Sequence, residues 1–235
     1  MTTLRTLVCT LLIGLIPLSI GCSSDKKTVN RWAGKTYMVN IPVDNWKRPR
    51  GSVGTEVGAY VPKFLLSVQD ASNGVNVLVG ASDADGKQDM CSPTIEIPAS
   101  APEIQIGPVD TKLHVANSVG GAAVPPLYGL TFTNILTDTP DAATIAGQFD
   151  AVLDTRDVYT LFNQLNEPSA EALCTFLNDS FSNPCIVCPK DSASTTCLEL
   201  KAVQLAAVPL TGIAVQAVSD TNLSANCVSA SDGGT

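Results

Sequence analysis

Short runs that alternate apolar and polar residues recur along most of this 235-residue chain, separated by glycine, proline, asparagine and aspartate. Residues 95–97 (Ile-Glu-Ile), 104–106 (Ile-Gln-Ile) and 149–153 (Phe-Asp-Ala-Val-Leu) show the pattern most clearly. A period of two turns one side-chain face towards a core and the other towards water, as in antiparallel sheets. The chain is therefore predicted to be mainly β, as an antiparallel β-sandwich or a partly open β-barrel.

Ten runs are expected to form strands, and their succession along the chain is compatible with a meander. They are Thr36–Ile41, Tyr60–Gln69, Val75–Ala81, Thr94–Ile97, Glu103–Ile106, Lys112–Ala116, Tyr128–Ile135, Thr144–Leu153, Cys197–Ala206 and Ile213–Val218.

One interval departs from this rhythm. Residues 158–165 place apolar side chains at helical spacing, after a candidate N-cap at Asp154 or Thr155. A second amphipathic pattern covers residues 173–177, beyond Pro168. The two patterns predict a short helical hairpin over about 155–178, inserted between strands and braced by disulfides.

The N-terminal segment contains a 14-residue apolar run, residues 7–20, preceded by Arg5. The run is too short to cross a bilayer as a helix. Its end, Leu18-Ser19-Ile20-Gly21-Cys22, resembles the lipobox of bacterial lipoproteins, which signal peptidase II cleaves before a lipid-bearing cysteine. The resemblance implies a signal peptide over residues 1–21, lipidation at Cys22 and a tether over 22–30. Ser23 after the cysteine, rather than aspartate, favours the outer membrane of the cell envelope.

Two further stretches are similar to segments of uncharacterised envelope lipoproteins of Gram-negative bacteria. They are residues 88–94 and residues 153–156 together with the cysteines that follow. This similarity implies a class of protein and a membrane attachment through the lipid, and it assigns no activity.

Besides the lipid-bearing Cys22, six cysteines remain after the expected cleavage: Cys91, Cys174, Cys185, Cys188, Cys197 and Cys227. An even number in an exported chain predicts a disulfide framework, for which 15 pairings exist. The favoured pairing is Cys174–Cys185, Cys188–Cys197 and Cys91–Cys227. A zinc site at the four cysteines between positions 174 and 197, or a redox pair at the C-x-x-C of residues 185–188, is the alternative, but oxidation competes with metal loading outside the cytosol.

Charge is distributed unevenly. Residues 22–50 carry seven bases and two acids, whereas the chain from Gly51 onward carries six bases and 20 acids. The basic stretch also holds Trp32 and Trp46, so it could rest on lipid headgroups, or the two rings could anchor a core. Nucleic acid is not an expected partner of so acidic a body.

Motifs for chemistry are weak. His114 alternates with Leu113 and Val115 and is expected on a solvated strand face, without a nucleophile nearby in sequence. Residues 80–84 fall one glycine short of a nucleophile elbow. Residues 83–89 resemble part of a calcium loop, but Asp-Gly between two strands is also an ordinary hairpin signal. No catalytic residue, metal or cofactor is therefore assigned.

These patterns together predict one disulfide-stabilised β-rich domain over residues 31–228 and a disordered tail over 229–235. The expected function is that of a non-enzymatic, lipid-anchored envelope protein with a structural or partner-binding role. The alternative is a carrier that holds a small apolar ligand or lipid in a barrel cavity. The sequence does not indicate the oligomeric state.

Overall fold

The computed structural model describes residues 30–71, 74–83, 85–99, 105–112, 115–116, 122–123, 125–136, 139–159 and 168–219. Its elements in chain order are η1 (Asn30–Trp32), β1 (Thr36–Asn40), η2 (Val43–Asn45), β2 (Trp46–Arg48), α2 (Ser52–Tyr60), β3 (Phe64–Ala71), β4 (Gly74–Ala81), β5 (Ile95–Ala99), β6 (Ile106–Lys112), β7 (Val115–Ala116), β8 (Ala122–Ala123), β9 (Pro126–Thr133), β10 (Thr144–Asp154), η3 (Thr155–Asp157), α3 (Ala170–Phe181) and β11 (Cys197–Leu210). Neither α-helix among these residues is long and apolar enough to cross a lipid bilayer.

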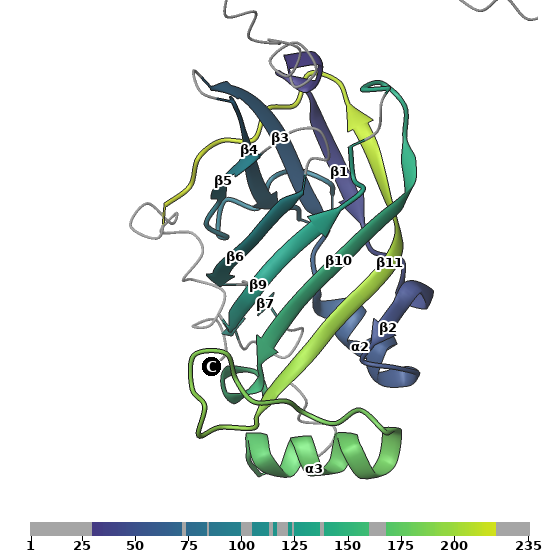
Figure 1. Cartoon of the computed structure of the whole chain (residues 1–235), viewed down its shortest axis with the longest axis vertical. Helices are drawn as coiled ribbons and strands as arrows, with labels where there is room; N and C mark the ends of the chain where they lie inside the picture. Colours follow the sequence, from purple (N-terminus) through teal and green to yellow (C-terminus); the bar gives the residue numbers. More distant parts are fainter. Residues whose placement is uncertain are drawn as a thin grey trace, which may run out of the picture.

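The main sheet is a nearly closed antiparallel barrel. Its strands follow the order β5-β4-β3-β1-β11-β10-β9-β6, so neighbours in space are mostly neighbours in the chain. The last strand, β11, pairs with the first, β1, from Thr36↔Leu210 to Asn40↔Ala206. The barrel remains unpaired between β5 and β6, which lie at the two ends of this order. Figure 1 shows the long, twisted strands of this wall.

The barrel interior is filled by aromatic side chains. The rings of Phe64, Phe132 and Phe149 pack with centroids 5.1–6.0 Å apart. All three are almost fully buried, and Trp46 adds an edge contact to Phe149 at 5.9 Å. Eight strands enclose a space that side chains can just fill, and these rings occupy it.

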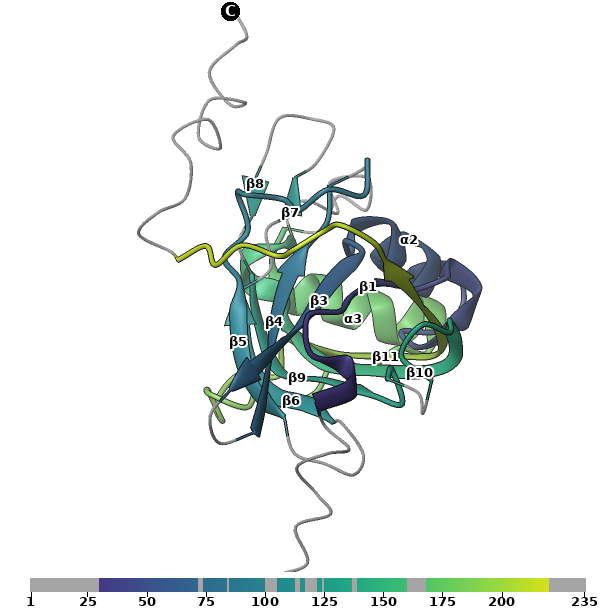
Figure 2. The ribbon, with the colours of Figure 1, turned by 90° about the horizontal axis from the view of Figure 1, so that it is seen from above.

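The two ends of the barrel are covered differently. At the upper end in Figure 1, η1 places the buried Trp32 over the core. At the lower end, α3 lies across the barrel and buries Leu173 and Leu177 against the core (Figures 1 and 2). Ser169 caps this helix, because its hydroxyl accepts a hydrogen bond from the Ala172 amide. We name these ends the tether end, which carries η1, and the loop end, which carries α3.

The lower wall is completed by β2 and α2. The strand β2 pairs with the first half of β11, below the segment that pairs with β1. The helix then packs its two glycines against Trp46: a Cβ on Gly58 would overlap the indole nitrogen, and one on Gly54 would lie 2.5 Å from the Pro49 carbonyl oxygen. Only a helix face without side chains allows this approach.

After β11 the chain crosses the outside of the barrel as a strap, residues 211–219. Val215 is buried on Leu65 and Leu78, which point outward from β3 and β4. The backbone amide and carbonyl of Gln216 hydrogen-bond to the Gln88 side chain. The amide of Val218 donates to the Thr94 hydroxyl, and its carbonyl accepts from the Thr94 amide. The strap therefore covers an apolar patch on the outer wall.

The mainly β class, the barrel alternative and most of the expected strands are confirmed. The prediction of a strand at residues 213–218 was wrong, because these residues form the strap. A strand was also expected to begin at Tyr60, whereas that residue ends α2, a helix that the sequence analysis did not predict. Of the helical hairpin, α3 is confirmed and residues 160–167 lie outside the described part.

Candidate functional site

The most constrained feature of the surface is the loop between α3 and β11, residues 182–196, which we name the braced loop. One disulfide joins Cys174 to Cys185 and another joins Cys188 to Cys197, with Cα atoms 5.5 and 5.0 Å apart. Both pairings were predicted from the sequence and are confirmed. The first disulfide fastens the loop to α3, and the second fastens it to the start of β11.

Backbone hydrogen bonds hold the same loop to the end of the barrel. Ile186 and Cys197 exchange two amide–carbonyl bonds of 2.7 and 3.2 Å. The amide and the hydroxyl of Thr155 both donate to the Thr196 carbonyl, at 3.1 and 2.5 Å. These contacts make the loop a rigid extension of the sheet.

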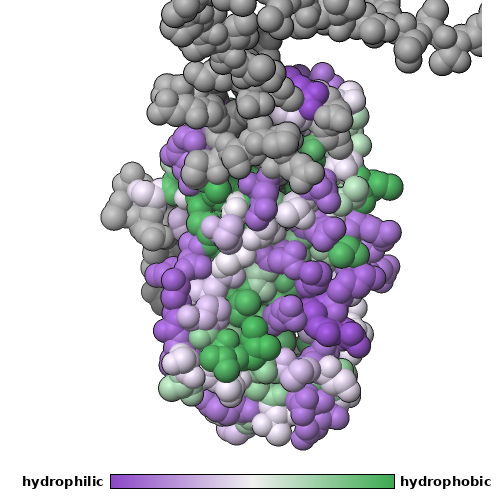
Figure 3. Space-filling view, in the orientation of Figure 1, coloured by the Kyte–Doolittle hydropathy of each residue, from purple (hydrophilic) through white to green (hydrophobic). Residues whose placement is uncertain are grey.

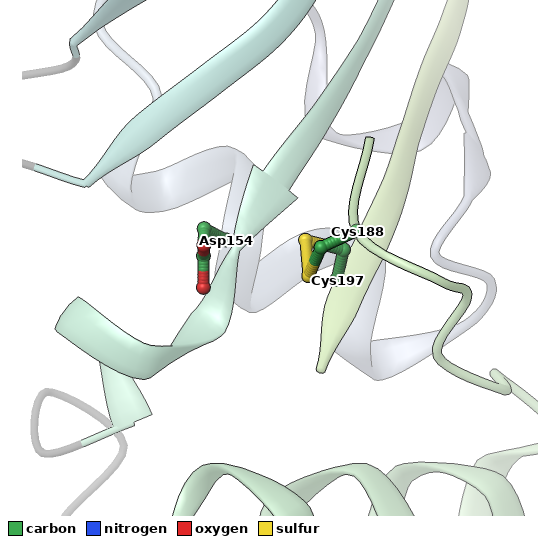
Figure 4. Close-up of side chains that lie close together, drawn as sticks. All are labelled: Asp154, Cys188 and Cys197. Carbon is green, nitrogen blue, oxygen red and sulfur yellow. A yellow bond between two sulfur atoms is a disulfide. The ribbon is translucent and has the colours of Figure 1, made fainter. Parts of the chain in front are cut away.

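A buried carboxylate sits beside the second disulfide. Figure 4 shows Asp154 at the end of β10, next to the bonded sulfurs of Cys188 and Cys197. One carboxylate oxygen and the two sulfurs lie within 4.8 Å of one another. The sulfurs are bonded to each other, so they offer no thiolate to a metal in this state. Cys185 and Cys188 likewise have different partners, which rules out the C-x-x-C motif as a redox pair here.

Asp154 is held by Arg156, which also reaches the braced loop. The guanidinium Nε and Nη2 donate to the two Asp154 oxygens at 2.9 and 2.7 Å, and Nη1 donates to Asp191 at 2.7 Å. The hydrogen bonds from Arg156 lower the pKa of Asp154, against the opposing effect of burial. Asp154 also caps η3 through the Arg156 amide, as the sequence analysis allowed.

Above this cluster the braced loop and the outer faces of the strands enclose an open hollow of about 340 Å³. Lys190 from the loop spans it and lies 2.8 Å from Asp110 of β6. This contact lowers the pKa of Asp110 and raises that of Lys190, so both are charged at neutral pH. The remaining lining residues come from β9, β10, β11 and the loop: Tyr128, Gly129, Asp150, Ala151, Val152, Pro189, Glu199 and Leu200.

The rim of the hollow carries further ion pairs. Lys201 contacts Asp150 at 2.9 Å, and Arg48 lies 3.5 Å from Glu199. The hydrogen bond to Asp150 raises the pKa of Lys201. In Figure 3 hydrophilic residues cover much of this side of the molecule, beside an apolar patch low on the same face.

The braced loop also exposes apolar side chains. Ile186 and Val187 are exposed although the residues that flank them are fixed by disulfides. Exposed apolar side chains on a rigid backbone are typical of a surface that binds another macromolecule. The acidic and basic side chains of the hollow described above are engaged in ion pairs, and the Tyr128 hydroxyl donates to Asp154 at 3.4 Å.

The other predicted site residues are placed as follows. Cys91 is disulfide-bonded, and its partner lies outside the described residues. Cys22, Cys227 and His114 also lie outside, so lipidation and the Cys91–Cys227 bridge stay predictions.

The calcium-like segment forms the turn of a hairpin. The Asp83 carboxylate accepts the Lys87 amide at 2.8 Å, and the Asp83 amide donates to the Lys87 carbonyl. Gly86 takes the left-handed conformation that the turn requires, with φ of 81°. The Asp89 carboxylate accepts from Cys91 and Ser92. These acids serve the local backbone, which favours the hairpin interpretation.

The bases of this stretch that the structure describes do not form one surface. Trp32 and Trp46 are buried core residues at different ends of the barrel, so neither can lie in a headgroup layer. Lys35 is near the tether end, whereas Arg48 is on β2 in the lower wall. The hypothesis that these tryptophans contact a membrane was wrong.

Sequence reasoning missed the residues that build the hollow. Asp110, Asp150 and Lys190 come from separate elements, and no local spacing relates them. The cysteine cluster was the signal that marked their neighbourhood. No family model matches the chain, and no match was found among the curated proteins or the solved structures compared with it.

Proposed function

We propose that this chain is a non-enzymatic, lipid-anchored protein of the cell envelope that presents the braced loop to a protein partner. Cys22 would carry the lipid, and Ser23 beside it favours the outer membrane. The single observation that supports this arrangement best is the placement of the two ends. The described chain begins at the tether end, and the braced loop lies at the opposite end of the barrel (Figure 1).

The disulfides support an extracytoplasmic location. Cysteine pairs persist in oxidising compartments and are rare in the reducing cytosol. Both described bridges serve to hold the loop, which is the segment that exposes Ile186 and Val187. A preorganised loop loses less conformational entropy on binding than a mobile one, which favours a recognition role.

The filled barrel interior favours this proposal over the carrier alternative. Phe64, Phe132 and Phe149 occupy the middle of the described interior, and Trp32 and α3 cover its ends. A ligand would have to displace these rings, whereas ligand pockets are usually formed in advance.

The anchor is tested by the intact mass of the native mature protein, measured before and after reduction and alkylation. We expect a chain that starts at Cys22, carries a diacylglyceryl group and an amide-linked acyl chain, and alkylates its six other cysteines only after reduction. A chain that starts at Met1, or at an unmodified Cys22, would contradict the proposal.

The partner surface is tested by photo-crosslinking in intact cells. A photoreactive amino acid at Val187 is expected to give one discrete protein adduct. The same group at Gln69, an exposed position on β3 near the tether end, is the matched control and is expected to give none. Equal labelling from both positions, or no adduct from Val187, would contradict a role for the braced loop.

A further inference from the structure

Three exposed apolar side chains lie in the half of the barrel nearest the tether end. Ile145 is 76% exposed, and Val208 and Ile213 are each 40% exposed. They come from β10, β11 and the beginning of the strap. Large exposed aliphatic side chains gathered in one region indicate a contact surface.

Strand register makes the first two diagonal neighbours. Thr144 lies opposite Ala207 in the antiparallel β10–β11 pair, so Ile145 and Val208 flank this pair on either side, on adjacent strands. Val208 in turn pairs with Met38 of β1, whose side chain packs on the patch under the strap. The exposed residues therefore continue the apolar outer wall that the strap covers in part.

The start of the described chain is fastened to the same region. Lys35 Nζ contacts the Asp141 carboxylate at 2.6 Å, and the Tyr37 hydroxyl donates to the Pro140 carbonyl at 2.8 Å. Burial raises the pKa of Tyr37 to about 12, so this hydroxyl keeps its proton. The segment that leads into Ile145 is thus bound to the segment that follows the tether.

We infer that the tether end rests on the lipid bilayer, with Ile145, Val208 and Ile213 in the interfacial layer. This inference depends on the proposed lipid anchor at Cys22. Eight Cα–Cα steps lead from Cys22 to Asn30, and even a fully extended segment of that length spans at most about 29 Å. The anchor therefore keeps these side chains close to the membrane, and an interfacial contact removes them from water.

Apolar contact, not charge, supplies this attachment. The described bases of the 22–50 stretch are divided between the two ends of the barrel, and Lys35 is already paired with Asp141. The body of the protein is acidic, so anionic headgroups add no attraction. Zwitterionic phosphatidylcholine is therefore a sufficient surface.

The test measures tryptophan quenching in the full acylated protein bound to vesicles of brominated phosphatidylcholine. Ile145→Trp and Val208→Trp place a reporter at the tether end, and Val187→Trp places a matched exposed reporter on the braced loop. The native Trp32 and Trp46 are buried and supply a constant background. We expect several-fold stronger quenching from positions 145 and 208 than from position 187.

The possible outcomes distinguish a failure of the bilayer contact from a failure of the lipid anchor at Cys22. Wild-type protein that does not float with the vesicles, like Cys22→Ser, would show that the anchor itself is absent. Protein that floats but leaves position 145 unquenched would overturn the bilayer contact while the anchor stands. Emission from position 145 that becomes shielded without vesicles, as protein concentration rises, would identify a second copy as the occupant and overturn the inference.

Discussion

Gln88 and Gln216 form a pair of hydrogen bonds between a side chain and a distant backbone. The Gln216 amide donates to Gln88 Oε1 at 2.7 Å, and Gln88 Nε2 donates to the Gln216 carbonyl at 2.7 Å. Thr94 makes a similar pair with Val218. The strap is therefore fixed mainly by side chains, with one backbone bond from the Thr94 amide to the Val218 carbonyl, in place of a strand ladder. It seals Leu65 and Leu78 from water.

Gln88→Ala is expected to loosen the strap without unfolding the barrel. Two hydrogen bonds at a partly exposed position contribute about 1–2 kcal/mol together. Amide hydrogen exchange at residues 213–218 should accelerate, while exchange in β10 and β11 stays constant. Gln69→Ala, in the exposed part of β3, is the control. Unchanged exchange at Gln216 would show that the side chain does not hold the strap.

Acid should destabilise the protein through Asp154. The Arg156 hydrogen bonds lower the pKa of this carboxyl below its ordinary value of 3.8. A lowered pKa means that the unfolded chain binds the proton more readily, so the contribution of Asp154 is complete above that value and is lost as pH falls through the folded pKa. Asp110 acts in the same direction, because Lys190 lowers its pKa.

Asp154→Asn tests this assignment. At neutral pH the variant should lose about 2 kcal/mol, since hydrogen bonds to a charged group are replaced by weaker ones. Its free energy of unfolding should also fall less steeply below pH 4 than that of the wild type, as measured by urea titrations at several pH values. Asp157→Asn changes a nearby exposed acid and is the control. Parallel acid profiles for wild type and Asp154→Asn would contradict the prediction.

Gly58→Ala should destabilise the protein although alanine is the better helix former. The intrinsic gain is at most about 1 kcal/mol. A methyl group here would overlap the Trp46 indole nitrogen, and overpacking costs about 1–3 kcal/mol. The melting temperature should therefore fall, whereas Thr55→Ala on the exposed face of α2 should leave it nearly constant. A higher melting temperature for Gly58→Ala would show that Trp46 can move to accommodate the added methyl group.

The two disulfides should differ in importance for a reason other than loop length. The bonded cysteines are 11 and nine residues apart in sequence. Loop-closure entropy predicts a stabilisation of about 3 kcal/mol from each disulfide, with a difference of only about 0.2 kcal/mol between them. Cys188 and Cys197 are both buried, whereas Cys185 is half-buried. Replacing the 188–197 pair with alanines should cost more stability in denaturant titrations than replacing the 174–185 pair. Equal losses of stability for the two double variants would show that chain entropy alone accounts for the effect of each disulfide.

The strands and two disulfides were predictable because their signals are local. The alternation over 149–153 is read directly from neighbouring residues, and it recurs in β10 as Phe149, Ala151 and Leu153 buried on one face. Cys174–Cys185 and Cys188–Cys197 close short loops, which limited the favoured choices. The expected strand at 213–218 failed because alternation does not show whether the backbone finds a partner strand or, as here, side chains.

The helix α2 and the hollow depend on tertiary contacts. The sequence of α2 contains two glycines, which lower its intrinsic helix propensity. The helix is stabilised instead by the burial of Val53 and Val57 and by the close packing of both glycines against β2. Lys190 and Asp110 meet only when the braced loop folds over the sheet. The spacing of these two residues along the chain does not indicate that contact.

Phe132→Ala is the direct test of the filled interior. Removing this ring from the cluster with Phe64 and Phe149 should cost about 3–5 kcal/mol and leave an apolar cavity. Benzene should then raise the melting temperature of the variant, because it binds the folded state, and should not raise that of the wild type. Phe181→Ala removes an exposed ring and should do neither. If benzene stabilised the wild type as strongly as the variant, the wild-type barrel would already contain an apolar cavity. The carrier alternative would then be preferred.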